Sequence, residues 1–233
     1  LQQYLFWDLN EFLQLGQTFD GIVSLYFCHL VPLTLESVSD VLVRDSNVLG
    51  PLRRLLNFAA QDLLQNLGFD FEVVSIECDE IYPENLQVEE IAEYLSVLKA
   101  DAFRTLEKNE VFITADTIVA LENQILGKPK NESEAKEMLQ KLSGKTHQVF
   151  TAFTIRSVEK NISKTDFATV TFDAISEAEI DFYIKNYKPF DKAGSYGIQE
   201  WLGMAKITEM QGSYYTIMGF PTHLVYSVLK DFQ

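Results

Sequence analysis

One stretch decides the fold of this chain: VFITADTIVAL, residues 111–121. Its first part, Val111 to Ala115, is an apolar run that predicts a buried strand ending at Asp116. A second strand, Thr117 to Leu121, is expected to follow beyond the acidic position. Ligands and metals are commonly held where strands of α/β sheets end, so the carboxylate of Asp116 is a candidate functional group. In isolation, a carboxylate that caps a turn is the simpler interpretation.

Helical patterns flank this stretch on both sides. Apolar residues recur at helical spacing over residues 91–102, which predicts an amphipathic helix whose edge carries Lys99. Capping-box patterns at residues 131–134 and 176–179 precede two further amphipathic runs. Further elements are expected at residues 71–76 (strand), 124–126 (strand), 148–156 (strand) and 224–232 (helix). The alternation of helices and strands predicts an α/β fold.

Composition limits the function classes. The 233 residues are 47% hydrophobic and 23% charged, with a formal net charge of -15, which disfavours extended nucleic acid as a partner. The two cysteines, Cys28 and Cys78, have neither disulfide-framework nor zinc-site spacing, so a reducing cytosol is the expected location. The uncharged stretch from Gly21 to Leu35 is shorter than the roughly 20 apolar residues of a membrane span, and no basic segment of a secretory signal precedes it.

Three polar segments accompany Asp116. The acidic pair Asp79-Glu80 follows a strand-like run and offers oxygen ligands to a hard divalent ion, although such pairs are more often simply solvated. Glycine and proline enclose Lys128 just after a strand, where an exposed turn lysine is the plainer interpretation. Residues 191–199, DKAGSYGIQ, form a glycine-containing loop that would let the backbone approach a ligand closely.

Together these segments resemble the Maf family of nucleoside triphosphate pyrophosphatases, over residues from about 62 to 232. The matching blocks are GFDFEV (68–73), DE (79–80), KA (99–100), ADT (115–117), GKP (127–129), LSGKTH (142–147), DKAGSYGIQ (191–199), GSY (212–214) and MGFP (218–221). The resemblance implies a Maf-like domain at residues 62–233. It also implies a mixed twisted sheet flanked by helices, with a cleft between two lobes, and a homodimer.

The resemblance further implies a reaction and a site. The Asp-Thr pair and the Gly-Ile-Gln loop are similar to the branch that hydrolyses dTTP and UTP to the monophosphate and pyrophosphate. Asp116 is then the general base, and Glu80 and Asp116 hold Mg²⁺ or Mn²⁺. Lys99 and Lys128 would neutralise charge on the phosphates. The residues implied to contact the substrate are Thr117, Lys192 and Gln199. We expect His147 to be structural.

The chain departs from the family at its N-terminal side. The family's Ser-x-Ser-Pro-Arg-Arg loop grips the triphosphate, but its last four positions fall here on NFAA, residues 57–60. The nearest arginine pair, Arg53-Arg54, lacks the preceding Ser-Pro. We therefore expect the sheet to lose an element and the site to lose two charges. A catalytically impaired nucleotide-binding or division-regulating protein is the alternative function.

A reading-frame error is our hypothesis for residues 1–61. Codons that encode Phe58 to Asp62 can give Ser-Pro-Arg-Arg when read one base later. The chain begins at Leu1 without methionine, and no family pattern precedes Asp62. These residues would then be frameshifted or upstream translation joined to an in-frame enzyme, and the competing interpretation is a lineage-specific N-terminus on a pseudoenzyme.

Overall fold

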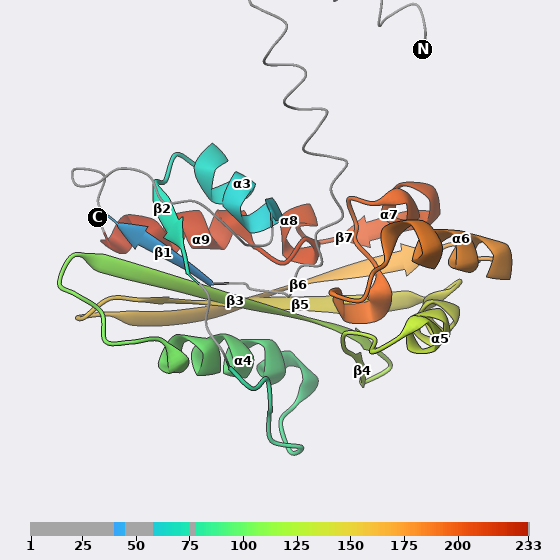
Figure 1. The fold of residues 1–233 in the computed structure, drawn as a ribbon, viewed down its shortest axis with the longest axis horizontal. Helices are drawn as coiled ribbons and strands as arrows, with labels where there is room; N and C mark the ends of the chain where they lie inside the picture. Colours follow the sequence, from blue (N-terminus) through green and yellow to red (C-terminus); the bar gives the residue numbers. More distant parts are fainter. Residues whose placement is uncertain (1–39, 45–57, 75–77, 233) are drawn as a thin grey trace, which may run out of the picture. The chain divides into compact units, whose positions relative to one another are not determined.

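The computed structural model describes residues 40–44, 58–74 and 78–232, all within the unit Glu36–Gln233. A seven-stranded sheet forms its centre (Figure 1). The strands, in spatial order, are β2 (Phe71–Val73), β1 (Asp40–Arg44), β3 (Glu110–Leu121), β5 (Thr146–Arg156), β6 (Asn161–Phe172) and β7 (Ile207–Gln211), with β4 (Gln124–Leu126) also paired with β3. The predicted class, α/β with helices flanking a sheet, is confirmed. We expected a mixed sheet, and every pairing among the described strands is antiparallel.

The central strand β3 is longer than the sequence predicted. We expected one strand to end at Asp116 and a second to begin at Thr117, but β3 runs without interruption through both residues. Asp116 pairs with Ala152 of β5 in the middle of that ladder. The prediction of a strand end was wrong because an opposite charge, Lys99 Nζ, lies 2.5 Å from Asp116 Oδ1 and compensates the buried carboxylate.

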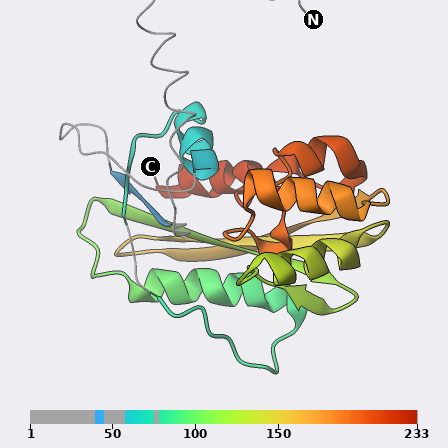
Figure 2. The same cartoon turned by 45° about the vertical axis from the view of Figure 1, so that its right-hand side comes forward.

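Helices cover both faces of the sheet. Helix α4 (Val88–Ala102) confirms the predicted amphipathic helix, and its Ile91 and Leu95 pack on Ile118 of β3. The opposite face carries α3 (Phe58–Asn66), α8 (Tyr214–Ile217) and α9 (Thr222–Leu229), as Figures 1 and 2 show. There Ala115 of β3 packs with Val225 of α9. Successive side chains of β3 therefore point to opposite layers, as strand geometry requires.

The second half of the chain supplies the remaining helices. They are α5 (Glu132–Leu142), α6 (Glu177–Tyr187), α7 (Trp201–Lys206) and the 3₁₀ turns η1 (Ala193–Ser195) and η2 (Lys230–Phe232). The capping box predicted at Ser176 and Glu179 is confirmed. The one predicted at residues 131–134 is half confirmed: Asn131 accepts from the backbone N–H of Glu134, but the Glu134 carboxylate accepts from the backbone N–H of Lys130. No helix within the described residues is long and apolar enough to cross a membrane.

Two expectations concerned the N-terminal side of the chain: the loss of a sheet element and the absence of the family's arginine loop. The expected loss of a sheet element is wrong for β1, because residues 40–44 pair with both β2 and β3. Residues 58–60 begin helix α3 where the family loop would end. The pair Arg53-Arg54 lies outside the described residues, as does most of the segment covered by the reading-frame hypothesis.

Candidate functional site

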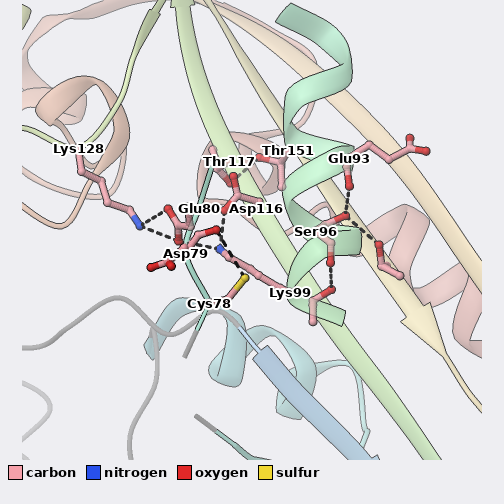
Figure 3. A network of polar contacts seen from close by, with 12 residues as sticks. Cys78, Asp79, Glu80, Glu93, Ser96, Lys99, Asp116, Thr117, Lys128 and Thr151 are labelled. Carbon is pink, nitrogen blue, oxygen red and sulfur yellow. Dashed lines mark hydrogen bonds and ion pairs between the residues drawn. The ribbon is translucent and has the colours of Figure 1, made fainter. Parts of the chain in front are cut away.

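Four charged side chains from four separate parts of the chain meet beside the middle of β3 (Figure 3). Lys99 Nζ lies 2.5 Å from Asp116 Oδ1 and 3.1 Å from Glu80 Oε1. Lys128 Nζ lies 3.2 Å from Glu80 Oε2. The structure thus brings together the four residues for which the sequence predicted roles in the metal and phosphate chemistry.

Helix α4 carries Lys99 to this position through a buried hydroxyl network. Ser96 lies one turn before Lys99, and its Oγ is 2.8 Å from Thr154 Oγ1 of β5. Thr114 Oγ1 of β3 donates to the carbonyl of Ser96 at 2.6 Å. Both contacts are buried, so they hold the helix at a fixed distance from β3 and β5.

The pKa values of Asp116 and Glu80 are shifted in opposite directions. Desolvation raises the pKa of Asp116, and the opposing charge of Lys99 limits that rise. Glu80 is also penalised by burial, but Lys99 and Lys128 together outweigh this and lower its pKa. Its side chain is 35% exposed, whereas that of Asp116 is 9% exposed. The arrangement gives one ionised carboxylate with low proton affinity and one with raised proton affinity, as proton transfer requires.

Beside this cluster, the described strands leave a short part of one edge of β3 without a partner strand. On the edge opposite β5, β1 pairs with β3 up to Thr114, and β4 pairs from Val119 onward. No described strand pairs with residues 115–118 on that edge. Asp116 and Thr117, which point to opposite faces, therefore flank the same interruption of the sheet.

A chain of hydrogen bonds supports Thr117 on the face opposite Asp116. Thr117 Oγ1 lies 2.9 Å from Thr151 Oγ1 of β5, and Thr151 Oγ1 donates to the carbonyl of Thr216 at 2.7 Å. Thr216 Oγ1 in turn donates to Asp166 Oδ2 of β6 at 2.5 Å. No sequence pattern singled out Thr151, Thr216 or Asp166 as site residues. The available signal was a polar hydroxyl in the middle of an otherwise apolar strand run.

The loop at residues 191–199 lies beside the turn that carries Lys128. The backbone N–H of Gly194 donates to the carbonyl of Gly127 at 3.2 Å. Lys192 forms ion pairs within its own region, with Asp191 at 2.9 Å and Glu200 at 3.2 Å. Gln199 is exposed. The described contacts therefore place this loop next to the site without joining Lys192 or Gln199 to the cluster around Asp116.

The oxygens of Glu80 and Asp116 are donors of the type that a hard divalent cation takes. Glu80 and Asp116 both approach the same ammonium group, that of Lys99, so their oxygens converge. The described residues contain no group of three or more His, Cys, Asp or Glu arranged to hold a metal. Two carboxylates completed by substrate phosphates and water are a donor set typical of Mg²⁺.

His147 is structural, as predicted. It is buried, its Nε2 lies 2.7 Å from Tyr196 Oη, and its ring packs against Phe172. Desolvation lowers the pKa of His147 to about 4, so the imidazole is neutral at physiological pH.

A mixed α/β fold with paired lysines and carboxylates beside its central strand has the composition typical of a phosphate-binding site that uses a hard cation. Residues 59–232 match the family model described as Maf-like protein. The chain belongs to the Maf family.

Relatives of this chain carry the name dTTP/UTP pyrophosphatase. The protein of that name from Flavobacterium psychrophilum is 49% identical over 172 residues, which cover 73% of this chain and 88% of the relative. Those from Phocaeicola vulgatus and Bacteroides thetaiotaomicron are 47% and 46% identical over 172 residues, covering 73% of this chain and 89% of each relative.

Proposed function

We propose that this chain hydrolyses nucleoside triphosphates, dTTP and UTP among them, to the nucleoside monophosphate and pyrophosphate. The observation that carries the proposal is the position of Asp116, a buried carboxylate with raised proton affinity that contacts Lys99, which in turn contacts Glu80. The names of relatives at 46–49% identity support the same reaction.

Asp116 acts as the general base. Its carboxylate accepts a proton from a water molecule, and the water oxygen forms a bond to the α-phosphorus. The bond between the α-phosphorus and the bridging oxygen to the β-phosphorus breaks, and pyrophosphate leaves with that electron pair. Lys99 and Lys128 offset the negative charge that develops on the phosphate oxygens.

Glu80 and Asp116 would hold the divalent cation, Mg²⁺ or Mn²⁺. When bound, such an ion polarises phosphate oxygens and offsets the charge of the triphosphate. The low pKa of Glu80 favours this role, since a metal ligand must be ionised in the working pH range.

The remaining roles extend from this core. We assign Thr117, Lys192 and Gln199 to substrate binding, of which Thr117 lies beside Asp116 in β3. A homodimer and a cytoplasmic location stay predictions. The alternative, a nucleotide-binding or division-regulating protein without turnover, is not favoured, because the relatives are named for a hydrolytic activity.

Hydrolysis in oxygen-18-labelled water tests the proposal. The purified chain is incubated with Mg²⁺ and UTP or dTTP, and the products are resolved by mass spectrometry. The proposal requires pyrophosphate and a nucleoside monophosphate that carries the label, because water attacks the α-phosphorus. Release of inorganic phosphate with a nucleoside diphosphate, or no turnover, would refute it.

A further inference from the structure

The loop at residues 191–199 contains two consecutive residues in the left-handed backbone region. The φ angles of Gly194 and Ser195 are 68° and 62°. Glycine adopts this region freely, but a serine there is uncommon, and its conformation persists only where the surrounding structure imposes it. Ser195 is fully buried, and its Oγ lies 3.1 Å from Met138 Sδ of α5. The contacts around the loop must therefore hold it in a conformation that it would not adopt alone.

One buried hydroxyl group holds the second half of this loop. Tyr183 of α6 has 0% exposure. Its Oη accepts a hydrogen bond from the backbone N–H of Gly197 at 3.0 Å, and its own O–H donates to the carboxylate of Glu200. Both bonds use the same oxygen, because a phenol hydroxyl donates one hydrogen and can still accept. Removal of this hydroxyl would leave the N–H of Gly197, itself in a buried residue, without this acceptor, which carries a desolvation penalty.

The carboxylate of Glu200 connects this hydroxyl to the first half of the loop. Glu200 Oε1 lies 3.2 Å from Lys192 Nζ, and the Glu200 side chain is 18% exposed. Gly197 leaves room for that carboxylate, since a Cβ atom there would lie 2.9 Å from Glu200 Cδ. Tyr183, Lys192, Gly197 and Glu200 therefore form one connected set of contacts across the loop, which we call the loop clamp.

The loop also contacts the elements that carry the charged cluster. The backbone N–H of Gly194 donates to the carbonyl of Gly127 at 3.2 Å, and Lys128 is the next residue. A Cβ atom at Gly194 would lie 2.9 Å from Val119 Cγ1, which belongs to the same strand as Asp116. The loop is therefore packed against both the turn that carries Lys128 and the central strand, so its conformation bears on where a substrate can lie.

We propose that Tyr183 and Glu200 are positioning residues for the binding of the nucleoside triphosphate. Through the loop clamp they keep the loop in its strained conformation before the substrate arrives, so binding does not have to order it. The inference rests on the proposed function, which assigns Lys192 and Gln199 of this loop to the substrate. The groups that act on the reacting atoms belong to other elements, β3 and α4 among them. Loss of the loop clamp should therefore weaken binding and leave the hydrolytic step unchanged.

The test compares two tyrosines of α6. Tyr183→Phe removes only the hydroxyl group of the loop clamp. Tyr187→Phe is the matched control, because the ring of Tyr187 stacks on that of Tyr183 and its side chain is exposed. We expect KM for UTP to rise by about tenfold in Tyr183→Phe, with kcat unchanged, and both constants to stay unchanged in Tyr187→Phe. Calorimetric titration with Mg²⁺ and a UTP analogue that has a methylene group between its α- and β-phosphorus atoms should show the same loss of affinity without turnover.

A substitution at Glu200 tests the other half of the loop clamp. Glu200→Gln keeps the shape of the side chain and removes the charge that holds Lys192, so KM for UTP must rise there too. The double variant, Tyr183→Phe with Glu200→Gln, should raise KM by less than the product of the two single effects, because both residues act through one set of contacts.

A structural role alone would lower the fraction of active protein, which reduces kcat and leaves KM and the affinity for the analogue unchanged. That result in folded Tyr183→Phe, or an equal rise of KM in Tyr187→Phe, would overturn the inference and leave the proposed function intact. If Tyr183→Phe does not fold, an unchanged KM in Glu200→Gln overturns the inference. Absence of UTP turnover in the unaltered chain would overturn the proposed function, and the affinity for the analogue would then decide whether the loop clamp positions a nucleotide.

Discussion

Lys99 of helix α4 holds Asp116 of strand β3 at 2.5 Å, so the buried carboxylate of the central strand is balanced by a cation from the helix layer. The same ammonium group contacts Glu80 at 3.1 Å. One lysine therefore links the group with raised proton affinity to the group with lowered proton affinity. The pH dependence and the metal dependence of the enzyme both follow from this arrangement.

Replacing Lys99 by methionine should move the acidic limb of the pH profile. Lys99 opposes the rise that burial imposes on the pKa of Asp116. Without it the pKa of Asp116 rises further, so the base stays protonated to a higher pH and activity is lost earlier as pH falls. The measurement is kcat/KM for UTP against pH. Lys99→Met should also reduce the plateau by about 10²–10³-fold, since a charge that stabilises the transition state is removed.

Lys128→Met is the matched control for that shift. Lys128 also lowers the pKa of Asp116, but its contribution is smaller than that of Lys99. The acidic limb of the pH profile of Lys128→Met should therefore move less than that of Lys99→Met. An equal shift in both variants, or a shift to lower pH in Lys99→Met, would contradict the assignment of that limb to Asp116.

Glu80→Gln should weaken metal binding more than it changes the reaction at saturating metal. The amide is a weaker ligand for a hard cation than the carboxylate, so the Mg²⁺ concentration that gives half-maximal activity should rise by about tenfold or more. A titration of activity with Mg²⁺ measures it. Asp79→Asn is the control, because Asp79 belongs to the same acidic pair, whereas Glu80 is the member that forms the ion pairs with Lys99 and Lys128. A similar metal requirement in both variants would remove Glu80 from the metal site.

The helices that flank the sheet could be predicted because their periodicity and caps depend on neighbouring residues in the sequence. Helix α4 and the capped helices α5 and α6 agree with the expected periodicity and caps. Strand β6 was missed, since most of its first seven residues are polar and only partly buried, which hides the two-residue period. We predicted that a strand ends at Asp116, but β3 continues through it. The lysine that compensates the charge of Asp116 lies 17 residues away in sequence, so a local pattern could not reveal it.

The cluster of charges was predicted only through family resemblance. The sequence spacing of the Asp79-Glu80 pair, Lys99 and Lys128 does not predict that these side chains lie close together. The hydroxyl network around Thr151 could not be predicted at all, since threonine is common in strands and its bond directions depend on tertiary contacts.

Gly203→Ala should destabilise the segment that carries Gln199. A Cβ atom at Gly203 would lie 1.9 Å from the backbone carbonyl oxygen of Ile198, so α7 or the preceding loop must move. Overpacking of this kind costs about 1–3 kcal/mol. Gly127→Ala is the control, because a Cβ there meets nothing within 4 Å. Urea unfolding of both variants gives the comparison, and equal midpoints would show that the loop yields freely.

Restoring a Ser-x-Ser-Pro-Arg-Arg segment immediately before Gln61 should lower KM for UTP. Two arginines add charge-assisted hydrogen bonds to the phosphates, a gain of about tenfold or more in affinity. The same segment with two glutamines is the control. Unchanged KM in the arginine variant would count against a missing phosphate clamp. The coding sequence is an independent check, since codons that cannot yield Ser-Pro-Arg-Arg in the shifted frame exclude the reading-frame hypothesis.

The most direct measurement is pyrophosphate release from UTP by Asp116→Asn beside the unaltered chain, at saturating Mg²⁺. The amide keeps the size of the side chain but cannot accept the proton of the attacking water. We predict a loss of at least about 10²-fold in kcat, with the exposed carboxylate variant Glu84→Gln unchanged and the circular dichroism of all three proteins alike. Turnover by folded Asp116→Asn within a few-fold of the unaltered chain would contradict Asp116 as the general base.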